Sequence, residues 1–468
     1  MRSAWLWVVL VSGCASLNTN VSIKEHPTPA TWQGAAPAPS IAALSWKEYF
    51  ADPQLTALIS EALTNNPDLG IALQRIEQAR AGVKRSTGAL LPRLDLALGS
   101  GVRRYGLYTM DGAGNATTDI TPGQVVPVNL GDFLAGFQAS WEIDLWGKLR
   151  NQKEATVARY LASVEGSHLV ITSLVADVAT AWFDLRALDR LEVLLREAID
   201  RQREAMEIVQ LQKAAGRATE LAVQQFEVQL AETKALAVIT SQQRVEAQSR
   251  LNLLLGRPPR AIAPSGAIAF EVEAPVGAGV PADVLRARPD IRAAELELKA
   301  AGADLESARA AFFPNITLGA SLGVQAFNPV FLARLPESLI YSVVGGLVAP
   351  LLNRSGLEAE FDGAKALKLE ALHAYQRVAL TAYAEVENGL SDVTTTSSLV
   401  ALRQQQQRTV ERSIETADTL FRAGKASSLE VLFAQQSRLR ADVELVEAWR
   451  RQRIARVTIY KVLGGGWQ

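Results

Sequence analysis

Large apolar side chains alternate with small or polar ones in four short stretches of the chain. In the first stretch, Leu94, Leu96 and Leu98 are separated by Asp95 and Ala97. A period of two places neighbouring side chains on opposite faces of a β-strand. Two soluble hairpins with one wet face would show the same alternation, but the second face here carries Gly, Ser, Thr and Gln with few charges, as the lumen of a barrel would. The pattern predicts strands at residues 94–105, 132–143, 315–325 and 340–350.

Two much longer stretches have the composition of helices. Residues 128–257, and the chain from 351 to its end, contain no proline and are rich in Ala, Leu, Glu, Gln and Arg, which are strong helix formers. Each stretch is interrupted once, near Gly216 and near Gly424. The arm that ends at the first break has about 69 residues and would be on the order of 100 Å long. The sequence therefore predicts two very long helical hairpins.

Short sequence signals recur at fixed distances and indicate an internal repeat. The segment 66–69 (Asn-Pro-Asp-Leu) returns 222 residues later at 288–291 (Arg-Pro-Asp-Ile), and the Ala-Gly pair at 215–216 returns 208 residues later at 423–424. Each half reads as a short helix, two strands, a long helix, a tight tip and a helix of medium length. The predicted organisation is a signal peptide (1–13), a lipid-anchored tether (14–45), an equatorial segment (46–66), a first repeat (67–256) with its tip near 213–218, an equatorial linker (257–287), a second repeat (288–464) with its tip near 422–427, and a C-terminal tail (465–468).

The number of strands predicts an oligomer. Four strands cannot close a barrel, for which about eight is the practical minimum, and open sheet edges are not tolerated inside a bilayer. A homotrimer would close the sheet. The expected fold is a mixed α/β membrane protein in which a trimeric 12-stranded β-barrel, with four strands per chain, is continuous with a long α-helical barrel.

Composition and charge exclude several classes of partner. The chain has 48 basic and 49 acidic residues, a net charge of −1 and a pI of about 6.4, without the basic stripe of a nucleic-acid-binding protein. Three histidines lie far apart and there is one cysteine, so zinc, thiol and disulfide chemistry have little to use. No run of apolar residues approaches the roughly 20 of a spanning helix. Membrane attachment is therefore expected through β-strands or a lipid.

Catalytic chemistry has few candidate residues. Glu142 and Asp144 lie beside Trp141, but the alternation places both carboxylates at a strand-to-helix junction with no histidine nearby to act as a base. No G-x-x-x-x-G-K-[ST] phosphate loop occurs. We predict no enzymatic activity, no metal and no cofactor.

The N-terminus has the form of a bacterial lipoprotein signal. A short positive region is followed by the apolar residues 4–10, and Val-Ser-Gly at 11–13 leads into Cys14. These small residues before a cysteine match the lipobox, in which the cysteine is acylated and becomes the first residue of the mature chain. An ordinary secretory signal, with a cysteine there by chance, is the alternative. The prediction is lipidation at Cys14, which anchors a chain without spanning the membrane.

Several of these features together resemble the TolC-like outer membrane factors. They are the aromatic segment 46–50 followed by Asp-Pro, the paired Pro-Asp helix starts, the Ala-Ala-Phe-Phe-Pro segment at 310–314, and the Gly-centred tips. The chain most resembles the NodT-type lipoprotein branch paired with resistance-nodulation-division (RND) pumps. The resemblance implies a trimeric exit duct in the Gram-negative outer membrane that extends into the periplasm. It would conduct drugs or other small molecules passively, after coupling to a periplasmic adaptor and an inner-membrane transporter of RND type.

The resemblance also suggests residues at the periplasmic aperture. Leu429 falls where some relatives have a hydrophobic constriction, and Glu430 where others carry an acidic ring. The aspartate expected one turn later is Phe433 here, which argues against a second acidic ring and against a cation block that depends on it. Leu429 and Phe433 could instead form an apolar plug, or both could pack between helices, and Glu430 could be a solvated charge.

The hairpin tips are candidates for adaptor contact. They include Lys213 and Gly216 in the first hairpin, and Arg422 and Gly424 in the second. Glycine at a tip also suits a turn that needs a positive φ, so a purely structural role is equally open. The alternative for the whole chain is a lipid-anchored coiled-coil scaffold of the envelope without channel activity. That alternative would not need four alternating strands.

Overall fold

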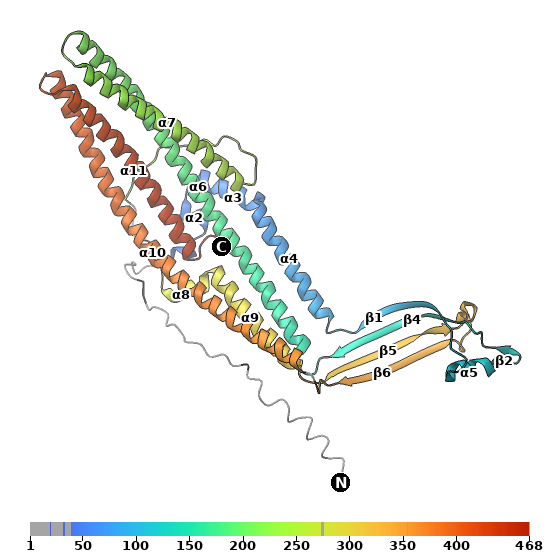
Figure 1. Ribbon diagram of the computed structural model, residues 1–468. Helices are drawn as coiled ribbons and strands as arrows, with labels where there is room; N and C mark the ends of the chain where they lie inside the picture. The colour runs from blue at the N-terminus through green and yellow to red at the C-terminus, as the bar shows by residue number, and fades with distance from the viewer. Residues whose placement is uncertain (1–18, 20–30, 33–38, 273–275, 353, 468) are drawn as a thin grey trace. The chain divides into compact units, whose positions relative to one another are not determined.

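The computed structural model describes residues 19, 31–32, 39–272, 276–352 and 354–467. Long helices dominate the chain, with one four-stranded sheet (Figure 1). The elements up to the first long helix are η1 (Ile41–Ala43), α2 (Trp46–Phe50), α3 (Pro53–Asn65), α4 (Pro67–Gly88), β1 (Arg93–Arg103), α5 (Met110–Thr117), β2 (Asp119–Thr121), β3 (Gln124–Val125) and β4 (Leu130–Ile143). The others are α6 (Lys148–Ala214), α7 (Glu220–Leu254), α8 (Pro281–Ala287), α9 (Pro289–Ala310), β5 (Asn315–Ala326), η2 (Pro329–Ala333), β6 (Leu339–Val348), α10 (Ser355–Arg422) and α11 (Ser428–Val462).

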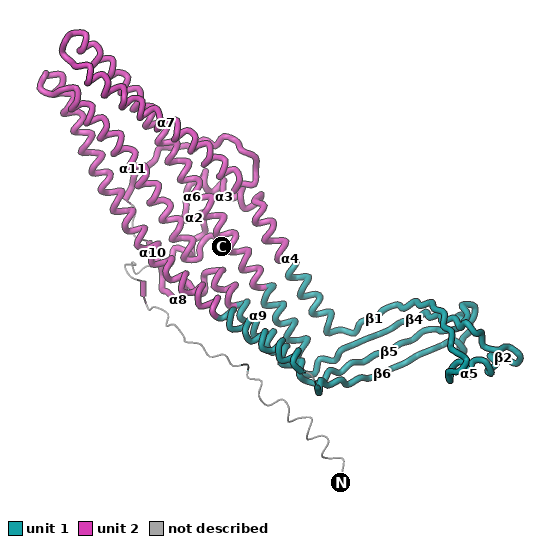
Figure 2. The backbone as a smooth tube through the Cα atoms, viewed as in Figure 1, with its two compact units in different colours: residues 1–23, 78–160, 296–372 teal, residues 24–77, 161–295, 373–468 magenta. Residues whose placement is uncertain are grey.

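The chain divides into two compact units, coloured separately in Figure 2. Unit 1 comprises residues 1–23, 78–160 and 296–372, and unit 2 comprises the remainder. Unit 1 contains the sheet, and unit 2 contains the tips of both helical hairpins. Helices α4, α6, α9 and α10 each have residues in both units.

Unit 1 is organised around an antiparallel sheet in the order β1-β4-β5-β6. One register row joins Leu96 to Phe137, Phe137 to Leu322 and Leu322 to Tyr341. Among the described residues, β1 and β6 each pair with one strand. The four strands overlap the four predicted ranges, but β1 ends at Arg103 and β6 at Val348, two residues before the predicted ends at 105 and 350.

The segment between β1 and β4 contains helix α5 and the β2–β3 hairpin. Thr109 caps α5, because its Oγ1 accepts a hydrogen bond from the Gly112 backbone N–H at 3.1 Å. A Cβ at Gly112 would come within 2.0 Å of the Gly106 carbonyl oxygen, so the turn into α5 requires glycine there. Elements of two to eight residues are too short for a periodic pattern to reveal.

The larger core of unit 2 brings together the N-terminal helices, α6 and α11. Ile59 of α3, Trp182 of α6 and Trp449 and Tyr460 of α11 are all buried in it. The Tyr460 ring stacks on Tyr49 with 4.2 Å between centroids. Its hydroxyl donates to the Leu44 carbonyl at 2.7 Å, and burial raises the pKa of this phenol. Burying large side chains such as these contributes roughly 1.5–3 kcal/mol each.

The predicted tether, 14–45, extends too far along the chain. Trp32 is only 6% exposed, and its ring lies 5.9 Å from that of Tyr383. The Ile41 backbone N–H donates to the Gly277 carbonyl at 3.1 Å. Trp32 belongs to the second core of unit 2, and Ile41 and Tyr383 pack against that core. Proline, alanine, threonine and serine predict an extended backbone, but composition does not reveal whether such a backbone packs against another segment.

Two junctions in unit 2 have matching contacts. The Asn66 side chain donates to the Leu254 carbonyl at 2.9 Å, and the Arg288 side chain donates to the Val462 carbonyl at 3.0 Å. The first members of these pairs are 222 residues apart and the second members 208, the spacings of the sequence repeat. A side chain at the start of α4 or α9 thus satisfies a carbonyl at the end of α7 or α11, where helical carbonyls lack partners.

Helix α6 corrects one expectation about apolar runs. Among the described helices it alone is long enough and apolar enough, by length and composition, to cross a membrane. Half of its apolar window is buried within the protein, and Leu174, Val178 and Trp182 of α6 belong to the core of unit 2. A buried core helix satisfies the same criterion, because its partners are apolar as lipid is.

Candidate functional site

One face of the sheet is apolar and uncharged. Leu94 and Tyr341, on the two edge strands, are 68% and 79% exposed. The register places alternate residues of all four strands on this face, and none of them is charged. Its large side chains are Leu94, Leu96, Leu98, Val102, Phe133, Phe137, Trp141, Ile143, Ile316, Leu318, Leu322, Val324, Leu339, Tyr341, Val343 and Leu347. An exposed apolar surface of this extent marks contact with a membrane or a partner.

The opposite face carries mostly small and polar side chains, and its larger apolar residues are Leu130, Leu134, Ile340, Val344 and Val348. One register row across the sheet consists of Asp95, Gln138, Ser321 and Ser342. The two serine hydroxyls lie 2.8 Å apart and are hydrogen-bonded. All charged residues within the four strands lie on this face: Arg93, Asp95, Arg103, Asp132 and Glu142. The segregation is the pattern of a membrane-spanning sheet with one lipid face and one aqueous face.

Two tryptophans hold the junctions between strands and helices in unit 1. Trp141 Nε1 donates to the Leu90 carbonyl at 3.0 Å, just before β1. Trp146 Nε1 donates to the Pro314 carbonyl at 2.8 Å, just before β5, and its ring stacks on Phe313 with 4.9 Å between centroids. Indoles at strand ends suit a membrane–water interface, where the ring is half apolar and the N–H needs a partner.

The acidic pair at this junction has structural partners. Glu142 forms an ion pair with Lys148, 3.1 Å from Nζ to Oε1. Asp144 accepts hydrogen bonds from the backbone N–H groups of Leu149 and Arg150, at 3.1 and 2.9 Å, in the first turn of α6. A carboxylate at this position accepts hydrogen bonds from N–H groups that have no partner within the helix, and its negative charge interacts favourably with the positive end of the helix dipole. Both side chains therefore have roles that need no catalysis.

The two hairpin tips have the same backbone construction. Gly216 and Gly424 have φ of +72° and +70°. The Arg217 N–H donates to the Gln212 carbonyl and the Lys425 N–H to the Leu420 carbonyl, both at 2.8 Å. These are the bonds of a helix end closed by glycine in the left-handed conformation. Glycine at each tip is thus explained by backbone geometry.

Both charged tip candidates have ion-pair partners. Lys213 pairs with Glu220 across the first tip, and Arg422 pairs with Asp418 within α10, 2.7 Å from Nη2 to Oδ2. The Lys213 side chain nevertheless remains about half accessible, and that of Arg422 remains largely accessible. Their structural partners do not prevent contact with another protein.

A groove of about 950 Å³ lies between the two tips within unit 2. Its lining combines residues of α6, α7, α10 and α11. The larger apolar members are Ile208, Leu221, Phe421 and Leu429, and the charged members are Arg217, Asp418 and Arg422. A lining that combines apolar and charged side chains has the composition of a protein-binding surface.

The aperture candidates occupy the first turns of α11. Leu429 and Phe433 are 38% and 57% exposed, so neither is fully packed between helices of this chain. Glu430 closes a capping box: the Ser427 N–H donates to Glu430 Oε2 at 2.6 Å. The Ser-x-x-Glu sequence at 427–430 predicts such a capping box. The acidic ring was suggested only by the family resemblance. Helix capping accounts for the position of this carboxylate.

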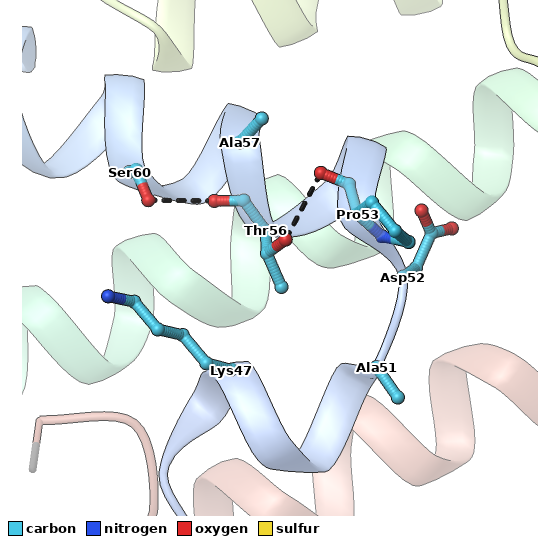
Figure 3. Close-up of a pocket in the computed structure, with 7 residues that line it drawn as sticks. All are labelled: Lys47, Ala51, Asp52, Pro53, Thr56, Ala57 and Ser60. Atoms are coloured by element: carbon cyan, nitrogen blue, oxygen red, sulfur yellow. Dashed lines mark hydrogen bonds between the residues drawn. The ribbon is translucent and has the colours of Figure 1, made fainter.

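A hollow between α2 and α3 is lined by seven residues, including Lys47, Asp52 and Thr56 (Figure 3). Asp52 Oδ1 accepts from the Gln54 and Leu55 backbone N–H groups, and Oδ2 accepts from Trp182 Nε1 at 3.2 Å. The Thr56 hydroxyl donates to the Pro53 carbonyl at 3.1 Å. Across the described part of the chain, no group of three His, Cys, Asp or Glu side chains could hold a metal ion. Cys14, the predicted lipidation site, lies outside the described residues.

The family match covers both halves of the chain. A model of the outer membrane efflux protein family matches residues 58–257 and 280–465. The chain belongs to this family. It is therefore a protein of the Gram-negative outer membrane that extends into the periplasm. The family and its structural neighbours are channel proteins and not enzymes.

Relatives within the family serve different exported compounds. The pyoverdine export outer membrane protein OpmQ of Pseudomonas aeruginosa is 32% identical over 94% of this chain and 91% of its own length. The solvent efflux pump outer membrane protein SrpC of Pseudomonas putida is 29% identical over 100% of this chain and 98% of its own. The structure of the open state of the Neisseria gonorrhoeae MtrE outer membrane channel matches with a TM-score of 0.83 and 26% identity, over 96% of this chain and 98% of that one.

Proposed function

We propose that the chain forms the outer-membrane exit duct of a tripartite efflux pump and conducts small molecules passively. The separation of apolar and polar side chains onto opposite faces of one sheet carries this proposal. An uncharged face meets the lipid, and the face that carries the charged residues, together with Gly, Ser, Thr and Gln, borders an aqueous path. A coiled-coil scaffold without a channel would have no use for such a sheet.

The duct is a homotrimer in this proposal. Within the described chain, β1 and β6 leave one edge each without a strand neighbour, and an open edge in a bilayer leaves backbone N–H and C=O groups without partners. Pairing β6 of one chain with β1 of the next closes a 12-stranded barrel from three copies. The matching junctions at Asn66 and Arg288 support an internal two-fold repeat, which gives each chain two similar helical hairpins for a periplasmic barrel.

The groove between the hairpin tips is the proposed docking surface for a periplasmic adaptor. The adaptor would connect the duct to an inner-membrane transporter of RND type, which supplies the energy. Leu429, Glu430 and Phe433 are the proposed aperture residues. Because OpmQ and SrpC are named for pyoverdine export and solvent efflux, we propose small organic compounds as cargo.

Deleting the gene in its host should increase intracellular accumulation of the exported compounds, and the intact gene should restore their export. Cross-linking in intact cells, followed by mass spectrometry, should recover one periplasmic adaptor and one proton-driven transporter. Recovery of an ATP-driven transporter would change the proposed pump type. Recovery of no envelope transporter from well-expressing cells would contradict the duct and favour the scaffold.

Cys14→Ser is expected to abolish acylation, because a serine hydroxyl does not replace the thiol that receives the lipid. Labelling cells with radioactive palmitate should leave the variant unlabelled. Ser16→Ala, two residues further on, should remain labelled as the wild type does. Label retained on Cys14→Ser would contradict the lipobox assignment.

Leu221→Asp is expected to reduce adaptor capture at least tenfold, which corresponds to about 1.4 kcal/mol of binding free energy. Leu221 lines the tip groove, and a carboxylate there would be buried without a partner on docking. Val238→Asp is the matched control, since Val238 is an exposed apolar residue of the same helix outside the groove. Co-purification from cross-linked cells measures capture. Equal losses in both variants would contradict the assignment of the groove.

A further inference from the structure

Each charged side chain on the polar face of the sheet has a partner of opposite sign. Arg93 Nε lies 2.7 Å from Asp95 Oδ2. Arg103 Nη2 lies 3.3 Å from Asp132 Oδ2, and the Glu142–Lys148 ion pair completes the set. The polar face thus has two positive and three negative side chains, and Lys148 at the start of α6 supplies the third positive group, so that the charges form three separate pairs.

The arrangement of these pairs keeps the two charges of each at nearly the same height along the strand. Arg93 and Asp95 are two residues apart on β1, while Arg103 and Asp132 lie on adjacent strands, with Gly101 opposite Asp132 in the register. Asp132 also accepts a hydrogen bond from Gln325 Nε2 at 2.6 Å, which holds its carboxylate against the sheet. Opposite charges this close largely cancel each other's field a few ångströms away, whereas a lone charge acts over a screening length of about 8–10 Å.

We propose that these charge pairs set the charge selectivity of the barrel. Because each charge is neutralised by its partner, the barrel does not distinguish positively from negatively charged cargo. The inference rests on the proposed function, because it takes the polar face as the lumen. Anionic, cationic and neutral compounds would then pass the barrel alike. Breaking one pair in a trimer would leave three equal charges around the lumen and create a preference for the opposite sign.

Single-channel recording in planar bilayers under a KCl gradient tests the proposal. Relative to wild type, Asp95→Asn should shift the cation-to-anion permeability ratio toward chloride by about threefold, because the Arg93 guanidinium is left unpaired. Arg93→Gln should shift it toward potassium by a similar factor. Asp111→Asn is the matched control, since Asp111 lies on α5 outside the sheet, and it should leave the ratio unchanged.

A charge swap separates the pair from a simple loss of structure. The double variant Arg93→Asp with Asp95→Arg keeps a pair at this height and should return the ratio to the wild-type value. Arg103→Gln and Asp132→Asn give a second set with the same signs, in case a variant of the Arg93–Asp95 pair fails to assemble. Heat-resistant trimers on SDS gels establish assembly before recording.

The outcomes for the inference and for the duct are distinct. The charge-pair proposal would be overturned if the wild type and all variants conduct ions but the permeability ratio does not change, or changes in the same direction for both members of a pair. The proposed duct would then still stand. Absence of current from the wild type, and from Phe433→Ser with its smaller side chain at the proposed aperture, would instead contradict the duct.

Discussion

Gly256→Ala is expected to remove most of the folded protein from the outer membrane. Gly256 has a φ of +66°, a conformation that costs an L-residue about 1–2 kcal/mol. A Cβ there would also lie 2.3 Å from the Asn65 carbonyl oxygen, which belongs to the backbone and cannot rotate away. Adding strain and overpacking gives a loss of stability of roughly 3 kcal/mol or more. Immunoblots of outer-membrane fractions and thermal melting of the protein purified in detergent measure the effect.

Gly266→Ala is the control that separates backbone strain from collision. Gly266 has a φ of +82° and no heavy atom lies within 4 Å of where a Cβ would be, so alanine there should cost only the backbone strain of about 1–2 kcal/mol. Gly464→Ala tests the matching junction, where a Cβ would lie 2.8 Å from the Ala287 carbonyl carbon at a φ of +92°. It should behave like Gly256→Ala. Similar melting temperatures for Gly256→Ala and Gly266→Ala would show that the close approach to Asn65 is not limiting.

Arg288→Met is expected to destabilise the second junction by roughly 2–3 kcal/mol, because the Val462 carbonyl loses a charged donor and the partly exposed Asp290 and Glu385 carboxylates lose their cation. The buried Arg288 guanidinium contacts Asp290 at 2.6 Å, Glu385 at 2.7 Å and the Val462 carbonyl at 3.0 Å. Burial opposes its charged form, but Asp290 and Glu385 outweigh burial and raise the pKa of Arg288. It therefore stays charged at any pH the protein meets. Methionine would keep the volume of the side chain without its hydrogen bonds.

Thermal melting and trimer yield would report the loss in Arg288→Met. Adding Asp290→Asn and Glu385→Gln to Arg288→Met should recover part of it, because the carboxylates no longer need a cation. The Val462 carbonyl would still lack its donor, so recovery should be incomplete. A triple variant no more stable than Arg288→Met alone would show that packing, and not the ion pairs, controls this junction.

The strands and hairpins could be anticipated because their signals are local. The alternation of Leu94 with Asp95 indicates a strand with one apolar and one polar face, whatever the strand pairs with. The long proline-free stretches permit uninterrupted helices such as α6. Glycines at 216 and 424 mark tips because a positive φ is a local need. Glu430 shows the limit of analogy: a family comparison suggested an aperture charge, while the local Ser-x-x-Glu signal predicts the capping box that the structure contains.

Other features depend on residues distant in the sequence. Trp32 packs against Tyr383, and Trp141 donates to the carbonyl of Leu90. Neither the composition nor the periodicity of a segment predicts such contacts, because each contact requires two distant segments to lie side by side. The pairing of Arg103 with Asp132 likewise follows from the register between β1 and β4. Alternation predicts that both side chains lie on the same kind of face, but it does not predict which residues are opposite each other.

The amino-acid sequence by itself determined the type of each major element, the face of each strand that carries charge, and the repeat of 222 and 208 residues, because these depend on residues a few positions apart or on direct comparison of the two halves. Only the tertiary structure decided which charges neutralise one another on the polar face, why Gly256 and Gly464 admit no side chain, and how Arg288 remains charged while buried. Each of these properties depends on contacts between separate elements. The burial of a side chain, the distance between two charges and the screening of their fields are defined only when the chain is folded.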